Sequence, residues 1–364
     1  MGRLIRFKLD DTRFYETQRF GIGAPRYILW KHEWYIVHDE YARSLRTLSQ
    51  REFVIEPYER KVWTAEDGSG EGQSLLFACW GGIGDLISLT PIFRALKDKY
   101  GFEEIGLSSP GINKYWFDGY IDHTIAYPPR QTRVEAYDQI FLLEEIFKET
   151  FIHNLTDVFA ARLGMELTPE ESRPFFRVDE DTANYTKRLL PEKKGKYVGI
   201  HFSASTPERS IPLAKALAMA HRIADEGHTA ILLGSQNDLD AYEDTEYGKT
   251  TCRELKPGIY NLCGILEDQD EIIGAMSHLD FFIGPDSGLL HIAGTLGIPG
   301  YGIFTPYDSS IRIGYYPSIE GVDVDEKYHT YNRDTFFPEE EMRARYEAAI
   351  ESIDWDALVE GAIQ

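Results

Sequence analysis

Cysteine and basic residues are scarce in this chain of 364 residues. Its three cysteines, Cys79, Cys252 and Cys263, show no CxxC spacing, which excludes a disulfide framework and the usual kind of zinc site. Lysine and arginine number 38 against 60 aspartates and glutamates, so the net charge is −22. A charge of this sign disfavours contact with nucleic acids and with anionic membrane surfaces.

Long apolar runs are also missing. The most apolar region, residues 279–304, is interrupted by Asp286, His291 and several glycines, so no transmembrane helix is expected. The first residues contain no apolar segment of a secretory signal, and Arg6 stands where a myristoylation signal needs serine or threonine. Together with the few cysteines, these features predict a soluble cytoplasmic protein.

The hydrophobic share of 43% is that of a globular protein, and the length fits two domains of ordinary size. Residues 1–70 contain stretches rich in aromatic and β-branched residues, which predict a small antiparallel β-rich extension. The aromatic residues of this extension are expected to form its core together with a docking surface. A polar, glycine-rich connector at 66–73 follows.

From residue 74 onward, apolar strand-like stretches alternate with amphipathic helical stretches. Strands are predicted at 74–80, 105–108, 124–127, 139–143, 197–202, 229–233, 259–262, 279–283 and 301–304, and helices at 154–164, 179–190, 212–226, 240–255 and 268–277. Such alternation is typical of parallel sheets with helices on both faces. The sequence therefore predicts two βα domains, at 71–178 and 179–335. A helical tail at 336–364 is expected to pack back over the first domain.

A glycine-rich turn, GGIGD, follows the first of these strands. It is not a dinucleotide-binding fingerprint, because Ile87 stands where that motif requires glycine. Gly82 and Gly84 allow another molecule to approach the backbone closely. Asp85 lies where open α/β sheets bind ligands, and it is either a helix cap or a general base for a hydroxyl group. Further on, Pro91 indicates either a new helix capped by Thr90 or a kink in one helix.

Residues 281–295, FFIGPDSGLLHIAGT, read as a strand, a turn and a helix. Asp286 stands where an N-cap belongs, so the first-turn amides of Ser287, Gly288 and Leu289 are predicted to point outward and bind an anion. His291 lies one turn further along the same helical face. The alternative is a capped helix whose serine and histidine only satisfy local hydrogen bonds.

The two segments GGIGDLISLTPIFRAL and IGPDSGLLHIAGTLGIPGYGIF together resemble glycosyltransferase family nine, the ADP-heptose:lipopolysaccharide heptosyltransferases and their relatives. The resemblance covers roughly residues 74–306. It implies an α/β fold of the GT-B architecture, with two Rossmann-like domains that face a cleft. It also implies that the C-terminal domain holds a nucleotide-diphosphate sugar, possibly ADP-heptose, and the N-terminal domain holds the acceptor. Transfer would invert the anomeric carbon without a metal or other cofactor.

The resemblance also implies roles for single residues. Asp85 matches the catalytic base, and Asp286, Ser287, Gly288 and His291 match the family's D-S-G-x-x-H phosphate site. In the loop after the strand at 197–202, which contains Ser203 and Ser205, the family's K-x-W-P motif is replaced by Arg209 and the three residues after it. Arginine still neutralises a departing diphosphate. Gly234 and Gln236 lie in the turn that replaces the family's glutamate-bearing nucleoside contact.

Two aspartate pairs, in the segments DVD at 323–325 and DWD at 354–356, spell the DxD signature of metal-dependent glycosyltransferases. Both lie outside the βα cycles, and an anion site built from amides needs no cation, so no metal is expected. Two other functions stay open. One is a non-catalytic nucleotide-sugar-binding module. The other is a divergent glycosyltransferase whose acceptor is a protein or a hydroxymethylated nucleic-acid base, although the charge favours a saccharide acceptor. The oligomeric state is not predicted.

Overall fold

The structure is a computed structural model that describes residues 4–9, 15–16, 28–29, 33–38, 53–60, 62–79, 82–109, 114–117, 119–143, 153–234, 238, 254–264, 266, 269–331 and 337–364. The chain divides into two compact units. The first unit comprises Met1–Thr150 and Thr156–Ser172, and the second comprises Phe151–Leu155 and Arg173–Gln364. The domain boundaries expected from the sequence stay predictions.

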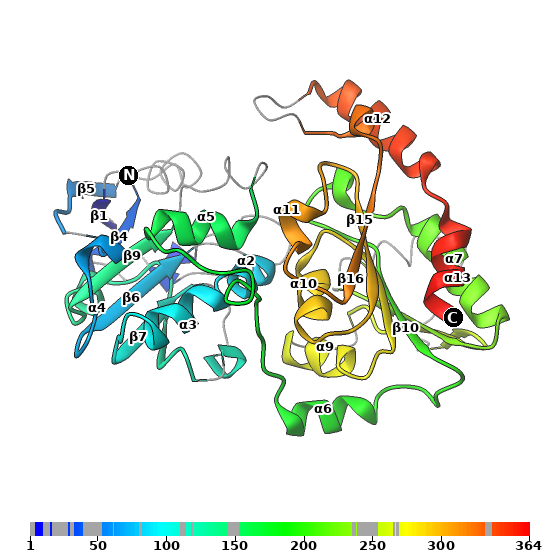
Figure 1. The fold of residues 1–364 in the computed structure, drawn as a ribbon, viewed down its shortest axis with the longest axis horizontal. Coiled ribbons are helices and arrows are strands. Elements are labelled where there is room, and N and C mark those ends of the chain that lie inside the picture. The colour runs from blue at the N-terminus through cyan, green and yellow to red at the C-terminus, as the bar shows by residue number, and fades with distance from the viewer. Residues whose placement is uncertain are drawn as a thin grey trace. The chain divides into compact units, whose positions relative to one another are not determined.

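The first unit contains a four-stranded parallel sheet with the order β8-β7-β6-β9 (Figure 1). Its strands are β6 (Ser74–Cys79), β7 (Glu104–Ser108), β8 (His123–Ile125) and β9 (Gln139–Leu143). Leu75, Leu76 and Phe77 of β6 are completely buried. A strand that is apolar on both faces belongs in the middle of a covered parallel sheet, which is where β6 lies. The strands predicted between residues 74 and 143 are thus confirmed in position, although β8 ends at Ile125 and not at residue 127.

Two short helices follow β6, namely α2 (Ile83–Ser88) and α3 (Thr90–Asp98). Pro91 lies in the first turn of α3, so the chain starts a new helix there instead of kinking one. Proline fits this turn because a first-turn amide has no acceptor within the helix. The N-cap is Leu89 and not Thr90, whose hydroxyl group donates to the carbonyl of Ile87 at 2.7 Å. The unit also contains α4 (Gln131–Val134) and α5 (Leu155–Arg162).

The N-terminal strands form two small antiparallel sheets, in the region where the sequence predicts a β-rich extension. β1 (Leu4–Leu9) lies between β4 (Tyr35–His38) and β5 (Phe53–Pro57), and β2 (Tyr15–Glu16) pairs with β3 (Ile28–Leu29). The amide of Ile36 in β4 donates to the carbonyl of Pro129 at 3.0 Å. Ile36 is also buried in one cluster with Leu76, Ala78 and Ile140. β4 therefore packs on one face of the parallel sheet of its own unit.

The second unit contains a seven-stranded sheet with the order β12-β13-β11-β10-β14-β15-β16. Its strands are β10 (Tyr197–His201), β11 (Thr229–Leu233), β12 (Glu254–Lys256), β13 (Ile259–Asn261), β14 (Phe281–Pro285), β15 (Gly300–Phe304) and β16 (Ile319–Asp323). All pair in parallel except the edge strand β12. From β10 the chain builds the sheet first toward β13 and then, after β14, toward β16, so the order reverses between β10 and β14.

Before the tail, the described part of this unit contains the helices α6 (Glu180–Lys187), α7 (Leu213–Asp225), α9 (Gln269–Met276), α10 (Gly288–Thr295) and α11 (Ser310–Ile313). The helix predicted at 240–255 is wrong at its end, because residues 254 and 255 belong to β12. There the antiparallel pairing with β13 outweighs the local helical pattern. Most of the rest of that predicted helix lies outside the described residues. In the described part of the chain, no helix combines the length and the apolar character that crossing a membrane requires.

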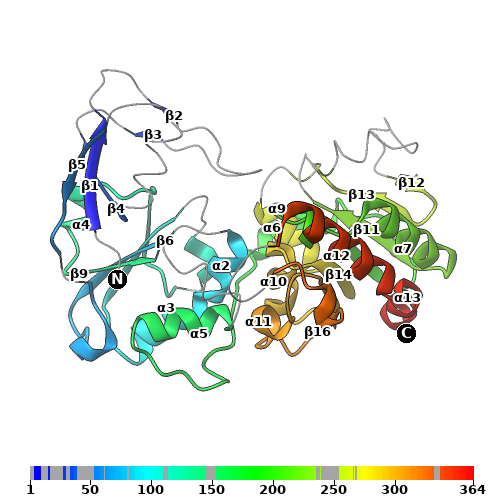
Figure 2. The ribbon, with the colours of Figure 1, turned by 90° about the horizontal axis from the view of Figure 1, so that it is seen from above.

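The tail forms α12 (Glu339–Ser352) and α13 (Trp355–Ile363). Ile350 and Val359 are buried in the core cluster of the second unit, together with Ile200 of β10 and Ala220 of α7. Figures 1 and 2 both show α13 beside α7. The expectation that the tail packs over the first domain is therefore wrong. Its apolar residues complete the core of the unit that directly precedes it in the chain.

Candidate functional site

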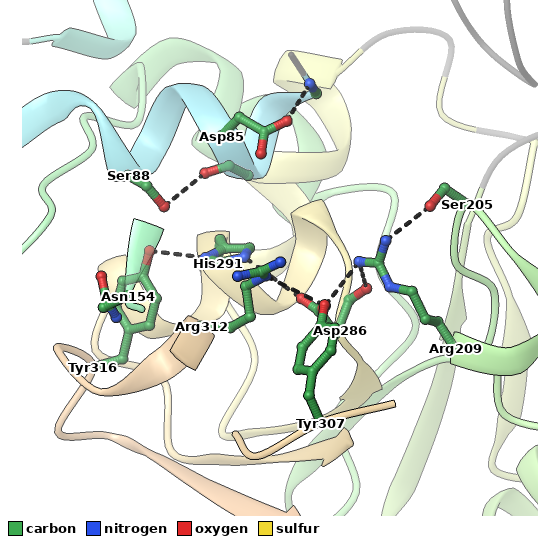
Figure 3. Close-up of polar contacts among 12 residues, drawn as sticks. Asp85, Ser88, Asn154, Ser205, Arg209, Asp286, His291, Tyr307, Arg312 and Tyr316 are labelled. Atoms are coloured by element: carbon green, nitrogen blue, oxygen red, sulfur yellow. Dashed lines mark hydrogen bonds and ion pairs between the residues drawn. The ribbon is translucent and has the colours of Figure 1, made fainter. Parts of the chain in front are cut away.

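The candidate donor site lies at the carboxyl ends of β10 and β14, where the strand order of the second sheet reverses. Open α/β sheets bind ligands at this position, because the connections leave the two strands in opposite directions. After β10 the chain forms a loop and the short 3-10 helix η4 (Pro207–Arg209). After β14 it continues through Asp286 into α10. Residues that the sequence suggested separately, Arg209 and Asp286, thus come together (Figure 3).

Asp286 and Arg209 form an ion pair in which the carboxylate is buried and the guanidinium group is partly exposed. Asp286 is 1% exposed, and its Oδ2 atom lies 2.9 Å from Nη2 of Arg209. Nη2 also donates to the main-chain carbonyl of Asp286, and Nη1 donates to the hydroxyl oxygen of Ser205 at 2.9 Å. The guanidinium group is therefore held at several points by two elements that follow neighbouring strands.

Two further residues that the sequence did not suggest contact the same carboxylate. The hydroxyl group of Tyr307 donates to Oδ2 of Asp286, and Nε of Arg312 lies 3.7 Å from this oxygen. The guanidinium group of Arg312 also lies over the Tyr307 ring, 4.8 Å from its centroid. No local signal identifies these residues, because neither belongs to a strand-turn-helix motif.

Burial and the neighbouring charges shift the pKa of Asp286 in opposite directions. Burial by itself raises the pKa of a carboxyl group, but Arg209, His291 and Arg312 surround this one, and they hold its pKa well below the usual range. The same burial, together with the negative charge of Asp286, raises the pKa of Tyr307. Tyr307 is therefore a neutral hydrogen-bond donor to an ionised carboxylate.

The start of α10 differs from the prediction by one residue. Its N-cap is Ser287 and not Asp286, and the helix begins at Gly288. Asp286 does not cap the helix because its carboxylate is bound by cationic groups, which attract it more strongly than a neutral amide does. The Ser287 hydroxyl makes no capping bond, and its buried oxygen has no hydrogen-bond partner in the described part of the chain.

The predicted anion-binding amides lie in the first turn of α10. Gly288 and Leu289 occupy this turn and are half-buried. First-turn amides have no acceptor within their own helix, and the positive end of the helix dipole adds to their attraction for an anion. His291 is 4% exposed, and its Nε2 atom lies 3.8 Å from Oδ1 of Asp286. The start of α10 and the guanidinium group of Arg209 thus both adjoin Asp286, and anion binding by the amides stays a prediction.

Two further predicted donor residues, Ser203 and Gly234, follow the neighbouring strands β10 and β11. Ser203 is half-buried in the loop after β10. Gly234 directly follows β11 and is buried, and a β-carbon at this position would lie 2.5 Å from Oδ2 of Asp238. Gln236 lies outside the described residues. Their roles in binding stay predictions.

Gly82, Gly84 and Asp85 form a group of their own at the carboxyl end of β6, in the first unit. Oδ2 of Asp85 accepts a hydrogen bond of 2.7 Å from the amide of Gly82, so its carboxylate closes the first turn of α2. Gly84 is buried within this helix, and its carbonyl accepts a bond from Ser88 at 3.1 Å. Asp85 thus has the geometry of a helix cap, which was one of its two predicted roles. Its role as a base stays a prediction.

The two DxD segments bind other parts of the protein. Asp323 accepts bonds from the amide and the hydroxyl of Ser309, at 2.6 and 2.8 Å. Asp325 and Asp354 accept from main-chain amides, and Asp356 forms an ion pair with Arg222. Each carboxylate thus stabilises a turn, a helix start or the tail. Among the described residues, no three His, Cys, Asp or Glu side chains are grouped as a metal site would require.

Comparison with known proteins identifies the family. The sequence profile described as "Glycosyltransferase family 9 (heptosyltransferase)" matches residues 130–339, which is more than half of the chain. No curated protein sequence matches the chain.

Several solved structures share the fold. ADP-heptose lps heptosyltransferase II from E. coli has a TM-score of 0.54 and 18% identity, over 76% of this chain and 99% of that one. A family 9 glycosyl transferase from Veillonella parvula has a TM-score of 0.60 and 13% identity, over 80% of this chain and 96% of that one. The iron-containing dodecameric heptosyltransferase TibC from E. coli, in complex with ADP-D-beta-D-heptose, has a TM-score of 0.56 and 13% identity. The match covers 100% of this chain and 90% of that one. At these identities the likeness concerns the fold alone.

The predicted fold class, α/β with two Rossmann-like parallel sheets as in GT-B enzymes, is confirmed by the sheets of the two units and by these structures. The family resemblance noted in the sequence is confirmed by the profile match. The chain therefore belongs to glycosyltransferase family 9 and is a glycosyltransferase.

Proposed function

We propose that this enzyme transfers a sugar from a nucleotide-diphosphate sugar to an acceptor hydroxyl group, with inversion at the anomeric carbon and without a metal. The observation that carries the proposal is the guanidinium group of Arg209, fixed by a buried carboxylate beside the first turn of α10. This arrangement lies where the strand order of the sheet reverses. It offers positive charge and directed amides, which are the groups that a diphosphate needs.

The leaving group is the nucleoside diphosphate. As the bond between the anomeric carbon and the phosphate oxygen breaks, negative charge grows on the phosphate oxygens. The amides of Gly288 and Leu289 and the guanidinium group of Arg209 stabilise this charge. One well-directed donor of this kind contributes about 3–4 kcal/mol to the stability of a transition state. The buried Ser287 hydroxyl supplies a further donor.

The acceptor needs a base. Its hydroxyl oxygen attacks the anomeric carbon on the face opposite the departing diphosphate, and the carboxylate of Asp85 takes the hydroxyl proton. Asp85 suits this role because its attachment to the Gly82 amide fixes the carboxylate at the carboxyl end of β6. Inversion follows because one bond forms as the opposite one breaks.

We propose ADP-heptose as the donor and a saccharide as the acceptor. The printed names of two similar structures support this donor, since they mention ADP-heptose. TibC is described as iron-containing. For the present chain the structural roles of all four DxD carboxylates support a reaction without a metal. The scarcity of cysteine supports a cytoplasmic location.

The test is a panel of nucleotide sugars, measured first by thermal stabilisation of the full chain. A ligand present at about 100 times its dissociation constant adds about 2.7 kcal/mol to the free energy of unfolding. The best binder is then incubated with saccharide, protein and hydroxymethylated nucleic-acid acceptors, with and without EDTA. We expect ADP-heptose to stabilise the chain most and transfer to a saccharide to continue in EDTA. Loss of transfer in EDTA would contradict the metal-free mechanism, and binding without transfer or hydrolysis would indicate a non-catalytic module.

A further inference from the structure

One segment of the second unit, residues 305–316 between β15 and β16, contacts η4, Asp286 and α10 in the candidate donor site. Thr305 donates to the carbonyl of Glu208 in η4 at 2.5 Å. Tyr307 and Arg312 contact Asp286, and the hydroxyl of Tyr316 lies 3.0 Å from Nδ1 of His291. We call residues 305–316 the support segment. Its side chains reach η4, the end of β14 and α10.

The contacts of the support segment converge on one atom. Oδ2 of Asp286 accepts the hydroxyl proton of Tyr307, lies 3.7 Å from Nε of Arg312 and forms the ion pair with Arg209 at 2.9 Å. Figure 3 shows Asp286 between the two arginines. The terminal torsion of an aspartate is intrinsically broad, so the orientation of its carboxylate is set by the groups that bind it. In this site those groups are Tyr307 and the two arginines.

We propose that Tyr307 and Arg312 are positioning residues of the donor site: they orient the Asp286 carboxylate, and through it the Arg209 guanidinium group, toward the donor diphosphate. The inference rests on the proposed function, which gives Arg209 its role. Arg209 is held on one side by Asp286 and on the other by Ser205 at 2.9 Å. A carboxylate that loses its other partners no longer holds the guanidinium in one direction. Misplacement of such a group by about 1 Å can reduce a rate by about a hundredfold.

The charges around Asp286 add a second consequence. The groups that face its carboxylate are Arg209 from η4, His291 from α10, and Tyr307 and Arg312 from the support segment. The nearby cations keep the carboxylate ionised in acid. Removal of Arg312 therefore raises the pH at which Asp286 gains a proton and releases Arg209. A residue that only fills space would not change this pH.

The experiment is a calorimetric titration of the full chain with inorganic pyrophosphate, a probe that does not depend on the base or sugar of the donor. The variants are Tyr307→Phe and Arg312→Gln. Their matched controls are Tyr197→Phe, which loses a hydroxyl bond to the carbonyl of Pro191, and Arg222→Gln, which loses ion pairs to the tail. We expect each site variant to bind pyrophosphate about tenfold more weakly, as for one lost hydrogen bond to a charged group. Both controls should bind it as the wild type does.

Repeating the titrations from about pH 7 down to well below the ordinary carboxyl pKa of about 4, where Asp286 gains its proton, tests whether Arg312 acts through the charge of Asp286. Affinity should begin to fall at a higher pH in Arg312→Gln than in the wild type, and Arg312→Lys, which keeps the charge, should restore the wild-type profile. Pyrophosphate also gains protons as the pH falls. Because this happens equally for every variant, it cancels in the difference in affinity between variants. In an Arg209→Gln background, Tyr307→Phe should have little further effect, because the group that it positions is gone.

The outcomes distinguish the two proposals. If the wild-type chain does not bind pyrophosphate or any nucleotide sugar, the donor site and this inference fail together. If the wild type binds and Tyr307→Phe and Arg312→Gln bind equally well, only the inference fails. It also fails if affinity falls while the pH profile of Arg312→Gln stays that of the wild type, since Arg312 then does not act through the charge of Asp286.

Discussion

The hydroxyl group of Tyr316 lies 3.0 Å from Nδ1 of His291, while Nε2 of the same ring faces Oδ1 of Asp286 at 3.8 Å. A carboxylate accepts hydrogen bonds but does not donate them, so a proton on Nε2 is the favourable arrangement. With the proton on Nε2, Nδ1 accepts the hydroxyl proton of Tyr316. Tyr316 thereby sets the tautomer and the orientation of a histidine that the D-S-G-x-x-H motif identifies.

Removal of this hydroxyl group tests the relationship. Tyr316→Phe keeps the ring that packs against Gly294 and leaves the buried Nδ1 atom without its partner. We expect a loss of about 1–3 kcal/mol of unfolding free energy, or roughly 2–4 °C in Tm for each kcal/mol. Thermal unfolding measures this change, with the exposed Tyr185→Phe as the control. Equal Tm values for the two variants would show that the contact is not stabilising.

Replacement of Asp85 separates its capping and catalytic roles. Asp85→Asn retains an oxygen that can accept from the Gly82 amide, but it is not a base. We expect turnover to fall by about 10²–10⁴-fold, the range for loss of a general base, with an unchanged dissociation constant for the donor. Single-turnover transfer and donor titration measure the two quantities. Asp179→Asn, at the N-cap of α6, is the control, and wild-type turnover by Asp85→Asn would remove Asp85 from the mechanism.

We expect Ser287 to contribute to ligand binding and not to the stability of the fold. An N-cap serine usually contributes about 1 kcal/mol, but the hydroxyl of Ser287 makes no capping bond and is buried without a partner in the described residues. We therefore expect Ser287→Ala to keep or raise Tm, and to weaken binding of the nucleotide sugar about tenfold.

The control variant for Ser287→Ala is Asp354→Ala. Asp354 caps α13 through a bond of 3.1 Å from the amide of Ala357, so this variant should lower Tm without affecting donor affinity. The opposite pattern, in which Ser287→Ala loses stability and keeps its affinity, would assign the hydroxyl a purely structural role.

The pH dependence of stability should depend on Asp286. Because its pKa is lowered in the folded protein, its ionised form stabilises the fold above its ordinary pKa of about 4, and this contribution is lost as the pH falls toward the lower folded value. Asp286→Asn should therefore cost about 3–5 kcal/mol at pH 7, and the difference from wild type should narrow below about pH 4. Thermal unfolding across this pH range measures both.

The exposed Asp325→Asn serves as the control for that series. Its pKa is also lowered, by hydrogen bonds and the charge of Lys327, but its carboxylate is exposed. The Tm of this variant should stay close to that of the wild type at every pH. A constant difference between Asp286→Asn and wild type at all pH values would mean that the charge of Asp286 does not contribute.

The tail should behave as part of the second unit's core. Ile350 in α12 is 4% exposed, and Ile350→Ala should cost about 2–5 kcal/mol. Ile363, near the end of α13, is only partly buried, so Ile363→Ala should cost less. Denaturant unfolding measures both, and an unchanged midpoint for Ile350→Ala would place the tail outside the core.

Local features could be predicted from the sequence because they depend on neighbouring residues. The strands Gln139–Leu143 and Thr229–Leu233 lie at the predicted positions, since a short apolar run between turn residues is a local signal. The family resemblance likewise rested on two contiguous segments. The same local rules failed for residues 254 and 255, where pairing with another strand decided the conformation.

The donor site depends on contacts between residues far apart in the sequence, which local patterns do not predict. Asp286 and Ser287 are both good N-cap residues, and the sequence analysis chose Asp286 wrongly because the choice depends on Arg209, 77 residues away. Tyr307, Arg312 and Tyr316 belong to no motif and were missed for the same reason.

The sequence by itself thus determined most of the strands, the family and the place of the turn between β14 and α10. Only the tertiary structure decided the strand order, the place of the tail and the partners of Asp286. The physical reason is that an ion pair or a buried hydrogen bond depends on distance in space, and the crossover connections of the sheet set that distance.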